Sequence, residues 1–167
     1  MSQSRNLIVA VVVAAALSFA GLAAWMARPA APEVTFVTLQ GEKISSADLR
    51  GKVVLVNFWA TDCVTCVKEM PDIAATHRKY RDRGFEAVAV AMRHDPPNFV
   101  INFAEKNALP FKVSLDPMGE LARAFGDVKV TPTTFVIDKR GRLVTRILGE
   151  PDFAKLHALI EQKLGES

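Results

Sequence analysis

The sequence has few of the residues that would tie a small domain together or hold a metal. Its 167 residues include two cysteines, three histidines, one tyrosine and two tryptophans. Domains stabilised by disulfides usually carry several cysteines spread along the chain, whereas Cys63 and Cys66 are separated by only two residues. A bond between them closes too short a loop to add much stability. The pair is therefore expected to serve chemistry or metal binding.

The residues around the pair do not complete a zinc site. A structural zinc needs a full set of cysteine and histidine ligands, yet the chain has no second CxxC motif. His77, His94 and His157 have no ligand spacing relative to the cysteines, and we expect them in a loop or on polar helix faces. Two thiolates suit copper(I) better, so a copper(I)-binding metallochaperone stays open as an alternative. We expect no resident metal and no cofactor.

The excess of positive charge is small. Lysine and arginine number 21 against 18 acidic residues, which gives a net charge of +3. The basic cluster at 77–83 ends an expected helix, where cations complement the negative end of the helix dipole. A nucleic-acid surface needs a larger cluster of basic residues on one face. We therefore expect no nucleic-acid partner.

By contrast, the amino terminus carries a long apolar run. Residues 7–26 are interrupted only by Ser18 and Gly21, and a helix of this length spans roughly 30 Å, the hydrocarbon core of a bilayer. Trp25 lies at the far end, where interfacial aromatic residues occur. We expect a cytoplasmic segment at 1–6 and a single-pass transmembrane anchor at 7–26. A signal peptide cleaved after Ala20 is the alternative, and both interpretations export the rest of the chain.

The remainder predicts one α/β domain at 34–167 behind a stiff Pro- and Ala-rich linker at 27–33. Runs of apolar and β-branched residues predict strands at 34–39, 53–59, 86–92, 111–115, 133–137 and 143–148. Helical patterns predict helices at 63–81, 95–107, 118–125 and 152–164, a short helix at 45–49, and Asp95 as a helix cap. We expect a central mixed β-sheet, parallel first and antiparallel at its end, flanked by helices.

The cysteine pair falls where a buried strand gives way to a helix. Free N–H groups and the positive end of the helix dipole favour a thiolate there. Cys63 lies at the first turn and Cys66 one turn further in, so we expect Cys63 to be the nucleophile and Cys66 the resolving cysteine. The sequence thus predicts dithiol–disulfide exchange.

The stretch from Val54 to Pro71, VLVNFWATDCVTCVKEMP, resembles the active-site stretch of the thioredoxin superfamily. More narrowly, Asn57 and the run that starts at Glu69 resemble the exported, membrane-tethered TlpA- and ResA-type reductases. The resemblance extends to VTPTTF at 130–135. It implies a thioredoxin-like fold, Pro132 as a cis-proline facing the cysteines, and Glu69 as a proton relay. An exposed helix carboxylate is the alternative for Glu69.

The resemblance also implies a function and a place in the cell. It implies a protein-disulfide reductase in the bacterial inner membrane, with its domain facing the periplasm or cell exterior. The implied partners are disulfides or dithiols of exported proteins, for example in cytochrome c maturation or copper-site assembly, and a transmembrane electron-donor protein. Asp62 stands where the family usually has tryptophan, and its charge disfavours the neighbouring thiolate. A thiol peroxidase is an alternative, although Ala60 does not fit its motif.

Overall fold

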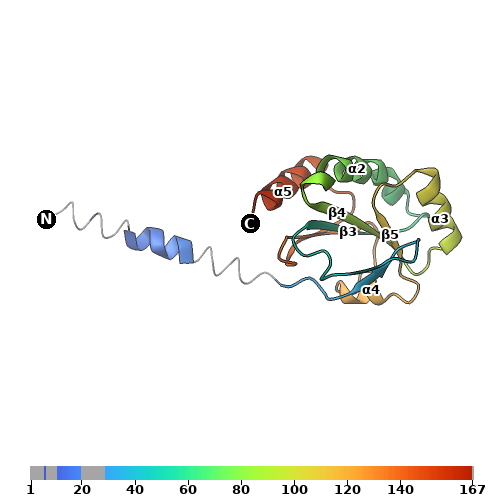
Figure 1. The fold of residues 1–167 in the computed structure, drawn as a ribbon, viewed down its shortest axis with the longest axis horizontal. Coiled ribbons are helices and arrows are strands. Elements are labelled where there is room, and N and C mark those ends of the chain that lie inside the picture. The colour runs from blue at the N-terminus through green and yellow to red at the C-terminus, as the bar shows by residue number, and fades with distance from the viewer. Residues whose placement is uncertain (1–5, 7–10, 20–28, 167) are drawn as a thin grey trace.

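The apolar runs of the sequence form the middle of a five-stranded sheet (Figure 1). The structure is a computed structural model that describes residues 6, 11–19 and 29–166. The strands are β3 (Val53–Trp59), β4 (Phe85–Ala91), β5 (Lys112–Leu115), β6 (Thr133–Ile137) and β7 (Leu143–Leu148), in the order β5-β4-β3-β6-β7. β3, β4 and β5 are parallel, whereas β6 is antiparallel to β3 and to β7. The predicted mixed sheet is therefore confirmed.

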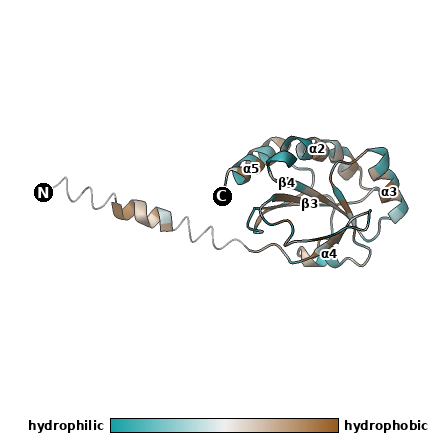
Figure 2. Ribbon diagram, in the orientation of Figure 1, coloured by the Kyte–Doolittle hydropathy of each residue, from teal (hydrophilic) through white to brown (hydrophobic). Residues whose placement is uncertain are grey.

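Helices cover both faces of this sheet. The helices are α2 (Val64–Tyr80), α3 (Pro97–Lys106), α4 (Glu120–Ala124) and α5 (Phe153–Gly165), with a 3-10 turn η1 (Arg81–Arg83) after α2. Alternate residues of β3 face opposite ways. Val53, Leu55 and Trp59 pack with α2, α3 and α5, while Val54, Val56 and Phe58 pack with α4. Figure 2 shows the hydrophobic colour on the inner strands and hydrophilic colour on the outward sides of the helices.

A small hairpin precedes the main sheet and corrects one prediction. β1 (Thr35–Val37) pairs antiparallel with β2 (Lys43–Ser45). The short helix expected at 45–49 does not form, because residues 43–45 extend as a strand and the next residues make a turn. The Asp48 carboxylate accepts from the backbone N–H of Ser45 at 2.8 Å and from its hydroxyl at 2.6 Å. These local bonds satisfy the backbone in a turn rather than a helix.

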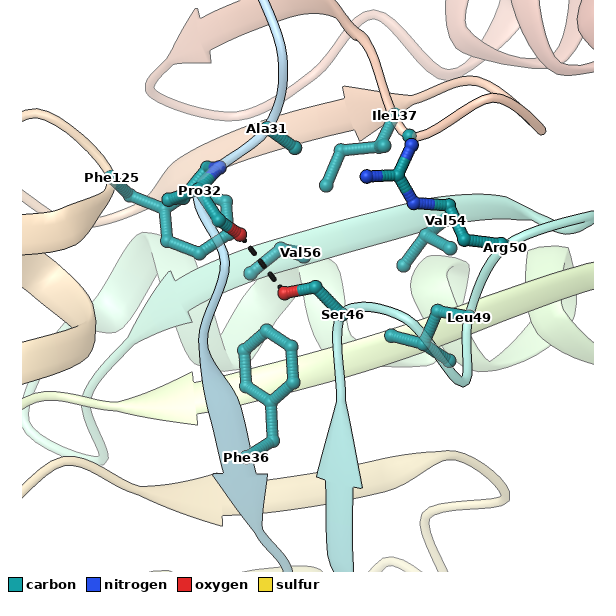
Figure 3. Close-up of a pocket in the computed structure, with 11 residues that line it drawn as sticks. Ala31, Pro32, Phe36, Ser46, Leu49, Arg50, Val54, Val56, Phe125 and Ile137 are labelled. Carbon is teal, nitrogen blue, oxygen red and sulfur yellow. Dashed lines mark hydrogen bonds between the residues drawn. The ribbon is translucent and has the colours of Figure 1, made fainter.

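The described part of the expected linker lies against the domain (Figure 3). The Ser46 hydroxyl donates to the Pro32 carbonyl at 2.9 Å, and the Ala31 N–H donates to the Gly141 carbonyl at 2.9 Å. The apolar cavity beneath Pro32 measures about 20 Å³, which is room for one water. This cavity is a packing gap at the edge of the domain.

The expected anchor lies mostly outside the described residues. Of the range 7–26, only 11–19 are described, and they form an exposed helix. Within the described part of the chain, no helix combines the length and apolar character needed to cross a membrane.

His77 departs from its expected place on a polar helix face. Its side chain is buried, and its Nε2 lies 3.1 Å from Glu86 Oε1. Its ring also packs against Phe85 and Phe111. This pair holds the carboxyl end of α2 against the start of β4, at the opposite end of α2 from the cysteines.

Candidate active site

The two cysteines form a disulfide at the amino terminus of α2. Cys63 is the N-cap residue, and its sulfur accepts from the Cys66 N–H at 3.2 Å. Its carbonyl accepts the first helical hydrogen bond, from the Val67 N–H at 3.0 Å. Because free N–H groups and the positive end of the dipole lie here, this position stabilises a thiolate once the disulfide is reduced.

The two sulfurs differ in their access to solvent. Cys66 is completely buried in the core cluster between β3 and α2, whereas Cys63 is half-buried at its edge. Val64, between them, is 83% exposed. A partner protein can therefore reach Cys63 but not Cys66. This geometry allows a mixed disulfide with a partner protein to form at Cys63, while Cys66 can re-form the internal disulfide with Cys63.

A buried carboxylate fixes the loop that leads from β3 to Cys63. Asp95 Oδ2 accepts from the Thr61 N–H at 2.6 Å, and its Oδ1 accepts from the Thr61 hydroxyl at 2.6 Å. The prediction of Asp95 as a helix cap is wrong, since Pro96 is the N-cap of α3 and no side chain bonds to it. Parallel pairing of Trp59 with Ala91 brings the two following loops together. Asp95 is thus a site residue that local sequence patterns missed.

The Thr131–Pro132 peptide bond is cis. Antiparallel pairing of Phe58 with Thr133 places this bond at the end of β3 where the cysteine loop begins. Pro132 is buried, and its carbonyl accepts from the Gly149 N–H at 2.9 Å. Among the described residues, no hydrogen bond is made by the backbone of Thr131. An extended peptide could therefore pair with Thr131 beside Cys63.

Glu69 lies one helical turn after Cys66 and is fully buried. The alternative of an exposed helix carboxylate is therefore wrong. Asn57 Nδ2 donates to Glu69 Oε1 at 2.8 Å and to Thr134 Oγ1 at 3.0 Å. Burial raises the pKa of Glu69 to about 7, although the hydrogen bond from Asn57 lowers it and the Glu150 charge raises it further. A carboxyl with this pKa can exchange a proton at neutral pH.

Charged side chains surround the disulfide on the surface. Asp62 is mostly exposed, and its Oδ1 lies 3.6 Å from His94 Nε2. Lys68 Nζ lies 3.1 Å from Glu150 Oε2, which joins the first turns of α2 to the loop after β7. Both pairs are exposed, so each contributes little to stability. They set the charge that a partner protein meets around Cys63.

A CxxC disulfide on a helix amino terminus, beside a cis-proline on a mixed sheet, defines a thioredoxin-like thiol–disulfide exchange protein. The profile of the Redoxin family matches residues 26–160, and the chain belongs to this family. It is 35% identical over 133 residues to "Thiol-disulfide oxidoreductase ResA" of Bacillus thuringiensis subsp. konkukian, covering 79% of this chain and 75% of the relative. The Bacillus subtilis protein of the same name is 34% identical over 127 residues, covering 76% and 70%.

Solved structures agree with this assignment. A crystal structure described as a thiol:disulfide interchange protein of the thioredoxin family, from Chlorobium tepidum TLS, superposes with a TM-score of 0.76 at 33% identity. The match covers 83% of this chain and 97% of that one. Together with the Cys63–Cys66 disulfide, these relatives identify the protein as a thiol–disulfide oxidoreductase.

Proposed function

We propose that this oxidoreductase works as a reductant of disulfide bonds in exported client proteins. One observation carries the proposal: Cys63 is accessible while Cys66, in the same disulfide, is completely buried. In the reduced protein, the Cys63 thiolate attacks a client disulfide and the first client sulfur leaves as a thiolate. The Cys66 thiolate then attacks Cys63 in the mixed disulfide and releases the second client sulfur. Two electrons pass to the client, and the protein is left with its internal disulfide.

Glu69 and Thr131 assist this exchange in the proposed mechanism. The Cys66 thiol must lose its proton before it attacks, and Glu69 is a buried carboxyl one turn away. A pKa of about 7 lets Glu69 accept that proton at neutral pH. The unbonded backbone of Thr131 holds the client as an added strand next to Cys63. Pro132 then presents this stretch of backbone to the client.

The proposed location of the protein in the cell rests on its sequence. The apolar run at 7–26 would anchor the chain in the bacterial inner membrane, with the domain facing the periplasm or cell exterior. Because disulfides persist there, a dedicated reductant needs electrons from a transmembrane donor protein. Clients of the proposed kind include cysteines of haem sites in cytochrome c maturation and of copper sites.

The reduction potential of the cysteine pair tests the direction in which it transfers electrons. Val64 and Thr65 lack the Pro-His pair of strongly oxidising exported enzymes, and this favours a reductant. We expect the Cys63–Cys66 couple to have a reduction potential near that of thioredoxin, about −270 mV. Equilibration of the full chain with glutathione and dithiothreitol buffers measures it. A potential of about −120 mV, as in strong oxidants, would overturn the reductant assignment.

A further inference from the structure

We infer that an arginine-lined pocket beside the disulfide binds acidic side chains of the client segment, so that clients with acidic residues near their cysteine are preferred. This inference rests on the proposed function, because it names the clients of the same site. The pocket measures about 460 Å³ and is formed by the loop after β4, by α4 and by the segment that leads to Thr131.

The pocket adjoins the active site through His94 and through the segment that leads to Thr131. The Met92 N–H donates to the Trp59 carbonyl at 3.0 Å, so the loop after β4 begins beside the end of β3. His94, in this loop, lies 3.6 Å from Asp62, the residue that precedes Cys63. On the other wall, Lys129 is two residues before Thr131. A client strand that pairs with Thr131 and continues past Val130 therefore runs onto the pocket.

The pocket carries more positive than negative charge. Its lining includes Arg93, Arg123 and Lys129 against a single carboxylate, Asp127. Asp127 lies 3.0 Å from Lys129 and offsets that charge. Arg123 donates to the Met118 carbonyl at 2.9 Å, and it forms no ion pair with any residue that the structure describes. Arg93 has no ion-pair partner within the part of the chain that the structure describes.

The two arginine side chains converge on Gly119. A Cβ atom at Gly119 would lie 3.4 Å from Arg123 Nη1 and 3.5 Å from Arg93 Cδ. Two positively charged side chains that share one pocket attract an anion to the space between them. A guanidinium group also presents paired N–H donors that match a carboxylate. Asp and Glu side chains of a client fit both requirements.

Besides Asp127, the carboxylate of Asp62 at the edge of the pocket would oppose an acidic client. Its ion pair with His94 turns it toward the loop after β4 and offsets its charge when His94 is protonated. Because these groups are exposed, their attraction and repulsion are screened by salt. The preference for acidic clients should therefore weaken as the ionic strength rises.

The test uses three cyclic peptides with the same disulfide ring and with Asp, Ser or Lys flanking the cysteines. The reduced full chain in detergent is mixed with each peptide, the reaction is quenched with acid, and the peptide dithiol is measured by chromatography. At low ionic strength the Asp peptide should react about tenfold faster than the Ser peptide, and the Lys peptide more slowly than both. In about 0.5 M salt the three rates should converge.

Reversing the charge of a pocket residue tests whether the pocket causes the preference for acidic peptides. Arg93→Glu should bring the ratio of Asp-peptide to Ser-peptide rates to one or below, whereas Arg78→Glu, near the far end of α2, should leave this ratio unchanged. Equal rates for all three peptides, or a ratio that survives Arg93→Glu, would overturn the acidic-client inference alone. If none of the peptides is reduced, the proposed reductase function itself is wrong.

Discussion

Asn57 Nδ2 donates to Glu69 Oε1 over 2.8 Å and so joins the middle of β3 to the first half of α2. The bond holds a fully buried carboxyl one turn from Cys66. The second oxygen of Glu69 has no hydrogen-bond partner within the described residues, and neither does Asn57 Oδ1. Burial removes water from the Glu69 carboxylate, and a single hydrogen bond does not replace it. The ionised form is therefore disfavoured, and the pKa is raised to about 7.

This buried acid should make the protein less stable as the pH rises. The pKa of Glu69 is raised from 4.5 to about 7 on folding. The unfolded chain therefore loses its proton first, and stability falls between these two pH values. The penalty above pH 7 amounts to about 3 kcal/mol. Glu69→Gln should abolish it, making the variant more stable than the wild type at about pH 8 but not at about pH 4.

Urea unfolding of the oxidised protein at several pH values measures this difference. Glu105→Gln, an exposed carboxyl on α3, is the matched control and should leave the pH dependence unchanged. If the free energy of unfolding of Glu69→Gln changed with pH in the same way as that of the wild type, burial would not raise the pKa of this carboxyl.

The bonds between Asp95 and Thr61 should stabilise the loop before Cys63. Asp95→Ala removes two hydrogen bonds to a charged acceptor and leaves the Thr61 N–H without its partner. We expect a loss of about 3 kcal/mol in the free energy of unfolding. Thr61→Val removes only the hydroxyl and should cost about 1 kcal/mol. Thermal denaturation distinguishes these variants from Asp62→Ala, an exposed neighbour for which we expect almost no change.

The buried pair of His77 and Glu86 should contribute to acid sensitivity. Burial opposes ionisation of Glu86, but hydrogen bonds from His77 and the Ala87 N–H hold its pKa below the usual value. This contribution is present above the unfolded pKa of Glu86 and is lost as the pH falls through the lowered folded value. Glu86→Gln should therefore be less stable near pH 7, and its deficit should shrink in acid. A deficit that stays constant with pH would contradict the pairing.

Asp62 should restrain the reactivity of Cys63. Its carboxylate immediately precedes Cys63 and disfavours a second negative charge there. Asp62→Asn should therefore speed alkylation of Cys63 by iodoacetamide near neutral pH, about twofold because the side chain is exposed. His94→Ala removes the partner of Asp62 and should slow the reaction. Alkylation at the wild-type rate in both variants would show that this pair does not influence Cys63.

Strands with strong local signals could be predicted from the sequence. β3, β6 and β7 form at their expected residues, since β-branched and apolar runs dominate each of them. The relation between Asp95 and Thr61 could not be predicted, because it depends on the pairing of β3 with β4. The same Asp-Pro-Pro sequence fits a helix cap equally well.

The burial of Glu69 could not be predicted for a similar reason. Its neighbours in the sequence are Lys68, which is exposed, and Met70, which is buried. Local periodicity is therefore compatible with either an exposed or a buried Glu69. The burial of Glu69 follows from its contact with Asn57, which lies on the strand that packs against this helix. The cysteine pair could be predicted as a redox site, because its position at a strand-to-helix junction and the resemblance of the surrounding stretch add to its spacing.

Capture of mixed disulfides in cells tests the division of work between the two cysteines. Cys66→Ala leaves Cys63 accessible and removes the thiol that we propose resolves the mixed disulfide. We expect this variant to remain joined to client proteins through Cys63 in non-reducing gels, whereas Cys63→Ala should capture none. Equal capture by both variants, or capture by Cys63→Ala alone, would contradict the assignment of Cys63 as the attacking group.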